Sequence, residues 1–148
     1  MLLDERIKTL AHNLVNYSCS LKKGENLLIE CTEADYQLVA CIIREAYAVG
    51  AYPFVSLGDS RIKRELLMGM DKELADKMAG FDKPKFEQMQ AYIGIRGGNN
   101  AYENSDVPAA NMDAYNLYYA HPVHHDIRVK KTKWVILRYP TPGMSAMS

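Results

Sequence analysis

The chain has 148 residues, and its 18 Lys and Arg side chains are balanced by 18 Asp and Glu side chains, so its formal net charge is zero. A chain of this length buries roughly 70% of its unfolded surface, which is enough for one core, and we predict a single domain over residues 1–148. Zero net charge provides no long-range attraction to nucleic acid or to an anionic membrane, so we expect neither as a partner.

The apolar runs and the cysteines indicate in which cellular compartment the protein is expected. No apolar run approaches the ~20 residues of a membrane span, and the acidic start "MLLDERIKTL" lacks the apolar segment of a secretory signal. The cysteines Cys19, Cys31 and Cys41 are odd in number and show no CxxC spacing. This pattern is typical of reduced, buried thiols, so we expect a cytoplasmic protein.

The first part of the chain alternates between helix and strand patterns. The segment "DERIKTLAHNLV" has the i, i+3, i+4, i+7 apolar spacing of an amphipathic helix, and "ENLLIEC" is a short apolar run that suits a strand. A second helix is predicted over "ADYQLVACIIREAYAVGA", with Gly50 as the residue that ends it. The segment "YPFVSLG" predicts a second strand, and Asp59 or Ser60 is expected to cap the charged helix that follows.

The second part of the chain continues this alternation. Residues 71–90 are charged and helical in pattern, and Gly80 and Pro84 are expected to divide them into two helices. The segment "AYIGIRG" predicts a third strand, and "GNNAYENSDVP" has the composition of a loop. Pro108 suits the first turn of another helix, and "KWVILRYP" predicts a fourth strand.

This order of elements predicts the fold class. Strands that alternate with helices of ten or more residues favour right-handed crossovers and a mostly parallel sheet of about four or more strands. The predicted strands are apolar runs without clean alternation, which a sheet covered on both faces requires. We therefore predict a three-layer α/β/α domain.

The stretch "HPVHHD" is the most conspicuous candidate for chemistry. His121 and His125 would share one face of a helix at i, i+4, the spacing that zinc-binding helices use. Pro122, however, disfavours helical dihedral angles at residue 121, and the remaining imidazole is the distant His12. Because histidines near acidic residues more often cap helices or form ion pairs, we expect no metal here and keep His121, His124 and His125 as the alternative.

The turn after the third predicted strand is the other candidate. Its sequence "GIRGGNN" matches neither GxGxxG nor a P-loop, but ligands of parallel sheets gather at the carboxyl ends of strands. We therefore treat Arg96, Asn99 and Asn100 as candidate cavity-lining residues, with a flexible surface turn as the alternative. The chain contains no GxSxG elbow, and no set of residues completes a catalytic site, so we assign no catalytic residue.

Three stretches in order resemble the N-terminal part of the thermophilic metallo-aminopeptidases, a family that includes aminopeptidase T, aminopeptidase S and PepS. These stretches are "NLVNYSCSLKKGENLLIE", "LVACIIREAYAVGAYPFVSLGDSRIKRELL" and "WVILRYPTPGMS". The resemblance covers about Leu10 to Ser145, and its most specific pieces are "REAYAVGA" and "W…RYPT".

The resemblance implies a two-domain enzyme that removes N-terminal residues from peptides with two divalent cations, zinc or cobalt being usual. In that family the metal ligands belong to a C-terminal domain that this chain lacks, and "HPVHHD" does not correspond to them. Family members resemble closed homodimers whose N-terminal domain helps to wall off an interior cavity. The implied partners are a peptide substrate, the chain's own C-terminal domain and a second copy.

Two functional hypotheses follow. The first is a non-catalytic N-terminal domain of a cytoplasmic metallo-aminopeptidase, inactive by itself and without a cofactor of its own. The second is a free-standing module that binds a peptide or small ligand through "RGGNN" and has no enzymatic activity. The continuation of the reading frame beyond Ser148 distinguishes them.

Overall fold

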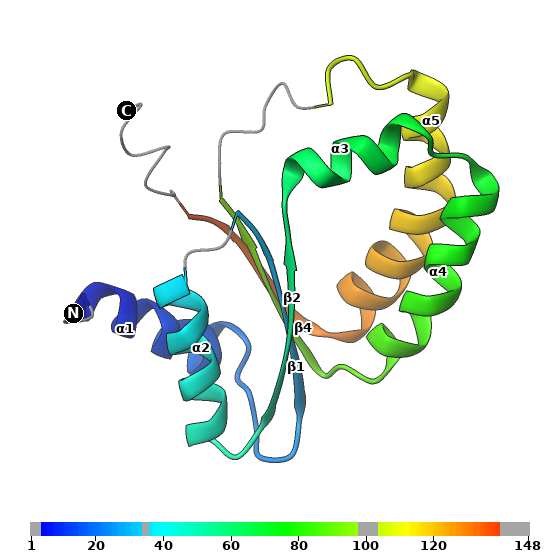
Figure 1. Ribbon diagram of the computed structural model, residues 1–148. Helices are drawn as coiled ribbons and strands as arrows, with labels where there is room; N and C mark the ends of the chain where they lie inside the picture. The colour runs from blue at the N-terminus through cyan, green and yellow to red at the C-terminus, as the bar shows by residue number, and fades with distance from the viewer. Residues whose placement is uncertain (1–3, 34–35, 98–103, 140–148) are drawn as a thin grey trace. The chain divides into compact units, whose positions relative to one another are not determined.

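The structure is a computed structural model that describes residues 4–33, 36–97 and 104–139 (Figure 1). The chain forms two compact units. The first unit comprises Met1–Gly58, Met89–Gly98 and Lys133–Ser148, and the second comprises Asp59–Gln88 and Asn99–Thr132. Each unit is therefore built from segments that are far apart in the sequence.

The first unit contains a sheet of four parallel strands in the order β2-β1-β3-β4. Its strands are β1 (Asn26–Thr32), β2 (Tyr52–Gly58), β3 (Ala91–Arg96) and β4 (Lys133–Arg138). All four strands predicted from the sequence are present, and their parallel pairing confirms the predicted α/β class. The chain passes from β2 to β3 across β1, so β2 lies at one edge of the sheet and β4 forms the other edge.

The strands differ in burial because they differ in the number of neighbours. The central strand β3 is buried over Ala91–Ile95, and β1 is buried at most of its positions. The edge strand β4 instead alternates between half-buried and exposed residues, and β2 is mostly exposed. The prediction that every strand lacks alternation is therefore wrong for β4, because Val135 and Leu137 pack against the core while Trp134 and Ile136 on the other face are exposed.

The helices α1 (Glu5–Asn13), η1 (Leu14–Ser18) and α2 (Tyr36–Ala48) complete the first unit. In Figure 1 the helices α1 and α2 lie on the same side of the sheet. The sequence predicted both, and α2 ends as expected, because Gly50 adopts a left-handed conformation with φ of 81°.

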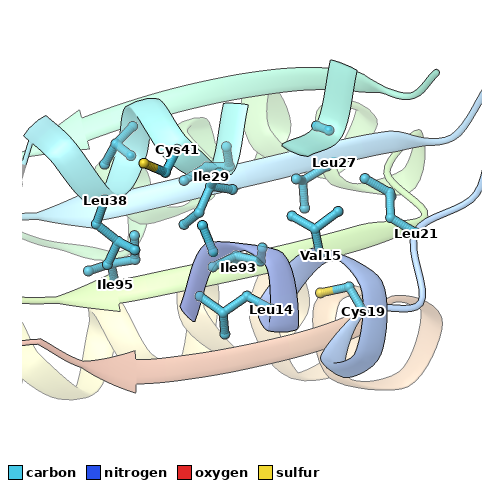
Figure 2. Packing of buried hydrophobic residues seen from close by; sticks show 14 of the residues in the cluster. Leu14, Val15, Cys19, Leu21, Leu27, Ile29, Leu38, Cys41, Ile93 and Ile95 are labelled. Atoms are coloured by element: carbon cyan, nitrogen blue, oxygen red, sulfur yellow. The ribbon is translucent and has the colours of Figure 1, made fainter. Parts of the chain in front are cut away.

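A hydrophobic cluster joins these helices to one face of the sheet (Figure 2). The strands contribute Ile29, Ile93 and Ile95, which alternate with residues on the opposite face. The helical side contributes Leu14 and Leu38, and both are almost fully buried. Full burial of one such side chain stabilises the fold by about 1.5–3 kcal/mol, so this cluster is the main core of the first unit.

The second unit is helical. It consists of α3 (Ser60–Met68), α4 (Lys72–Glu87), α5 (Ala109–Tyr115) and the π-helix η2 (Asn116–Val129). Asp59 caps α3 as the sequence predicted, since its carboxylate accepts a hydrogen bond of 2.8 Å from the backbone N–H of Arg61.

The prediction that Gly80 and Pro84 divide residues 71–90 into two helices is wrong, because α4 is continuous from Lys72 to Glu87. A proline inside a helix removes one N–H and brings its ring against the carbonyl of residue i−4. Here residue i−4 is Gly80, so Pro84 removes the N–H that would donate to the Gly80 carbonyl, and the helix continues nonetheless. Both residues that look like helix breakers therefore lie inside one helix.

Candidate metal-binding cluster and the edge of the sheet

The π-helix η2 carries a cluster of three potential metal ligands, His121, His125 and Asp126. One ligand atom from each residue lies within 4.8 Å of those of the other two. Nε2 of His121 is 3.5 Å from Oδ1 of Asp126, and Nδ1 of His125 is 3.1 Å from the same oxygen. The two imidazole rings stack with centroids 4.5 Å apart, so both histidines face the same side of the helix.

The π-helical turn explains why these three residues meet. In an α-helix of 3.6 residues per turn, residue 126 would lie roughly 140° around the axis from residue 121. A π-helix closes its turn between residues i and i+5, so Asp126 comes back onto the face of His121, beside His125. The expectation that Pro122 takes residue 121 out of a helix is wrong, since η2 runs through both residues.

His124 does not join this cluster. Its ring packs edge-on against Phe86, with ring centroids 5.1 Å apart, and its Nδ1 accepts a hydrogen bond of 2.9 Å from Nε of Arg128. Of the three histidines named as alternative ligands, the structure therefore brings His121 and His125 together and turns His124 toward α4. Asp126 is the third residue of the cluster instead of His124. In the sequence, only its position five residues after His121 could have indicated this.

The cluster is exposed to solvent. The side chains of His121, His125 and Asp126 are 56%, 52% and 46% exposed. The hydrogen bond from His125, with the positive charge of Lys130 nearby, lowers the pKa of the Asp126 carboxyl. The fourth histidine, His12, belongs to the first unit, where its Nδ1 lies 3.2 Å from Oε1 of Glu45.

A polar network lies on the sheet face opposite the hydrophobic cluster. The hydroxyl of Tyr92 donates a hydrogen bond of 2.6 Å to Oε1 of Glu30 and accepts one of 3.3 Å from Nη2 of Arg96. Tyr92, Gly94 and Arg96 are alternate residues of β3 and share this face, and Glu30 on β1 is paired with Gly94. Burial, with the nearby Glu30 carboxylate, raises the pKa of Tyr92 above its usual range.

Arg96, a candidate cavity-lining residue, therefore stands at the carboxyl end of β3 and is held by Tyr92. Asn99 and Asn100, the other two candidates, lie outside the described residues. Sequence reasoning missed Glu30 and Tyr92. The sequence gives little indication of their role. A single glutamate or tyrosine in an apolar strand points to a polar network only when the strand register, which the structure supplies, places it beside a partner.

The first unit also has a surface pocket of about 310 Å³, lined by Lys8, Cys41, Arg44, Glu45 and Ala48. The pocket lies between residues of α1 and α2, and it carries charges of both signs.

All three cysteines are buried thiols, as predicted. None of the described helices is long and apolar enough to cross a membrane.

A comparison with solved structures supports an assignment of the fold. The chain is similar to wild-type AmpT from Thermus thermophilus, with a TM-score of 0.68 and 20% sequence identity over 94% of this chain and 37% of that chain. At this identity the likeness shows the fold alone, and it agrees with the predicted α/β/α class. This chain thus spans little more than a third of the length of AmpT.

A second solved structure is an open conformation of a 2-hydroxyisobutyryl-CoA ligase, with a TM-score of 0.33, 13% identity, and coverage of 75% of this chain and 27% of that chain. A TM-score of 0.33 is too low to support a shared fold. No curated protein matches the sequence.

The family model described as thermophilic metalloprotease (M29) matches residues 3–147. Because that match spans nearly the whole sequence, the chain belongs to the M29 family of thermophilic metalloproteases.

Proposed function

We propose that this chain is the N-terminal, non-catalytic part of a metal-dependent aminopeptidase that removes N-terminal amino acids from peptides. One observation carries the proposal. The chain matches the M29 family over residues 3–147, yet it covers only 37% of AmpT. We place the catalytic machinery in the remaining part of the protein, which is cytoplasmic in this proposal.

Membership of a metalloprotease family implies divalent metal ions. We propose two cations of the zinc or cobalt class, and the ligands described in this chain do not fit such a centre. Two cations about 3.5–4 Å apart need ligands for both ions. The cluster at His121, His125 and Asp126 supplies two imidazoles and one carboxylate, too few for two ions. The side chains of the cluster are about half exposed. We therefore derive no catalytic step in this chain.

The role that we propose for this part is to support a homodimer and to wall off its substrate cavity. Arg96 stands at the carboxyl end of a central strand, where ligands of parallel sheets gather. Its guanidinium suits the carboxylate of a short peptide, because it donates paired, charge-assisted hydrogen bonds. Asn99 and Asn100 follow it in the sequence and belong to the same proposed lining. Nucleic acid and membranes are not partners in this proposal.

The test compares the 148-residue chain with the product of its complete reading frame. Both are assayed with added zinc or cobalt against dipeptides and amino-acid amides. We expect hydrolysis by the longer protein and none by the chain alone. Hydrolysis by the chain alone would contradict the proposal, because it would require a complete catalytic site within these residues.

The alternative is a free-standing module that binds a peptide or small ligand. The pocket between α1 and α2 favours it, because Lys8, Arg44 and Glu45 give that pocket polar groups for a zwitterionic ligand. This alternative predicts a reading frame that ends near Ser148, whereas the leading proposal predicts roughly 250 further codons. The sequence of the gene therefore separates the two.

A further inference from the structure

We propose that His121, His125 and Asp126 form a binding site for one divalent transition-metal ion, such as zinc. The donors are Nε2 of His121, Nδ1 of His125 and Oδ1 of Asp126. Two imidazole nitrogens and one carboxylate oxygen are ligands that zinc, cobalt and nickel share. This inference does not depend on the proposed aminopeptidase function.

The spacing of the donors fits a tetrahedral ion. Zinc binds histidine nitrogen and carboxylate oxygen at about 2.0–2.2 Å, so two of its tetrahedral ligands lie roughly 3.4 Å apart. The two measured distances to Oδ1 of Asp126 are 3.5 Å from His121 and 3.1 Å from His125. One ligand atom of each residue lies within 4.8 Å of those of the other two, and the stacked imidazoles have to rotate until both ring planes point at the ion.

The helix holds the three donors together before an ion arrives. The residues Tyr119, Val123 and Ile127 of η2 are buried, and the Tyr119 hydroxyl donates a hydrogen bond to Asp82 of α4. The ligands therefore project from a backbone that is fixed by its buried face. An ion has to order three side chains and no loop, which limits the entropic cost of binding.

The charges around the site set its strength. Asp126 supplies the one negative charge of the cluster, and Nζ of Lys130 lies 3.8 Å from its Oδ1. A bound cation would compete with Lys130 for this carboxylate. Because the Lys130 side chain is 60% exposed, it can turn into solvent when an ion binds.

The experiment titrates zinc chloride into the metal-free chain, expressed without a histidine tag, by isothermal titration calorimetry. Cobalt absorption in the visible range reports the ligand field independently. The variants are His121→Gln, His125→Gln and Asp126→Asn. The matched control is His124→Gln, which alters an adjacent imidazole that faces Phe86. Circular dichroism checks that each variant is folded.

We expect each of the three variants to weaken zinc binding at least about tenfold, because loss of an outer-shell partner alone costs 10–100-fold. The control should bind zinc within about twofold of the unchanged chain. Lys130→Ala should bind zinc a few-fold more tightly, since a competing positive charge is removed. No zinc uptake by the unchanged chain would overturn the proposal. So would equal affinities in all variants, or an equal loss in the His124→Gln control.

Discussion

At the scale of single residues, Gly94 decides how the polar network on the sheet is built. A Cβ at this position would lie 3.0 Å from Cγ1 of Ile136, 3.0 Å from Cε1 of Tyr92 and 3.2 Å from Nη1 of Arg96. The missing side chain leaves the space through which Arg96 reaches the hydroxyl of Tyr92. Glycine weakens a strand in general, and here it is required by the close approach of its neighbours.

We expect Gly94→Ala to lower the free energy of unfolding by about 1–3 kcal/mol, the usual cost of overpacking a core. Two of the three neighbours belong to rigid rings or branched chains in the sheet, so they yield little. The midpoint of urea denaturation measures the effect. An unchanged midpoint would show that the sheet relaxes around the added methyl group.

The control for this substitution is Gly80→Ala in α4. An added Cβ at Gly80 meets nothing within 4 Å, and alanine is favoured over glycine in a helix interior by about 0.5–1 kcal/mol. Gly80→Ala should therefore raise the free energy of unfolding. The two glycine substitutions thus have opposite predicted signs for one and the same chemical change.

Cys19 makes stability depend on alkaline pH. Burial raises the pKa of its thiol from 9.0 to about 11, and its Sγ donates a hydrogen bond to the Tyr92 carbonyl. Between these values the unfolded chain has lost the proton and the folded chain keeps it, so stability falls as pH rises. We expect Cys19 to account for a loss of up to about 2 kcal/mol across this window.

Urea denaturation of the unchanged chain and of Cys19→Ala at several pH values tests this. The free energy of unfolding of the variant should fall less steeply above about pH 9. Parallel curves for the two proteins would show that Cys19 keeps its usual pKa. The stability of both proteins still falls at high pH because of Tyr92, since burial raises the pKa of its hydroxyl as well.

At the scale of the elements, two helices continue through a proline. The helix α4 contains Pro84 in its last turn, and η2 contains Pro122 within a π-helix. In both helices the chain keeps its buried residues on one side, among them Ala75 and Ala79 of α4 and Val123 of η2. The burial of these apolar faces outweighs the local preference of proline to end a helix.

Pro84→Ala tests this account of α4. Alanine restores an N–H that can donate to the carbonyl of Gly80, and it removes the ring that crowds this carbonyl. We expect a gain of about 1 kcal/mol in the free energy of unfolding. This is less than the roughly 3 kcal/mol cost of proline in a helix interior, because Pro84 lies in the last turn of α4, where helices fray. A lower thermal midpoint would show that α4 depends on the proline.

At the scale of the whole molecule, the two units differ in how their backbone is protected. The first unit holds β1 and β3 between parallel neighbours, and its hydrophobic cluster covers one face of the sheet. The second unit has few fully buried side chains along each helix, such as Leu67 in α3 and Phe86 in α4. Its α5 has no buried residue.

Amide hydrogen exchange should therefore be slower in the central strands of the first unit than in the helices of the second unit. We expect the slowest exchange in β1 and β3, because both strands are hydrogen-bonded to neighbouring strands on both sides and are largely buried. Exchange in α3 and α5 should be much faster. Mass spectrometry of peptides that cover Asn26–Thr32, Ala91–Arg96 and Ala109–Tyr115 provides the comparison. Equal protection in α5 and β3 would contradict this view of the core.

Much of the fold could be predicted from the sequence, because local patterns carried it. The apolar runs gave all four strands, the helical spacing gave α1 and α2, and Asp59 gave the start of α3. The candidate metal cluster was only partly predictable. Two of its residues, His121 and His125, follow from the i, i+4 spacing, whereas Asp126 enters only through the π-helical turn.

The sequence by itself determined which segments are strands and helices and to which family the chain belongs, because hydrophobic periodicity and motif order are written along the chain. Only the tertiary structure decided that Glu30, Tyr92 and Arg96 form one network, and that His124 turns away from its two neighbours. The physical reason is that strand register and helix pitch join residues that no local pattern connects. Each of these contacts depends on where a neighbouring element buries its apolar face.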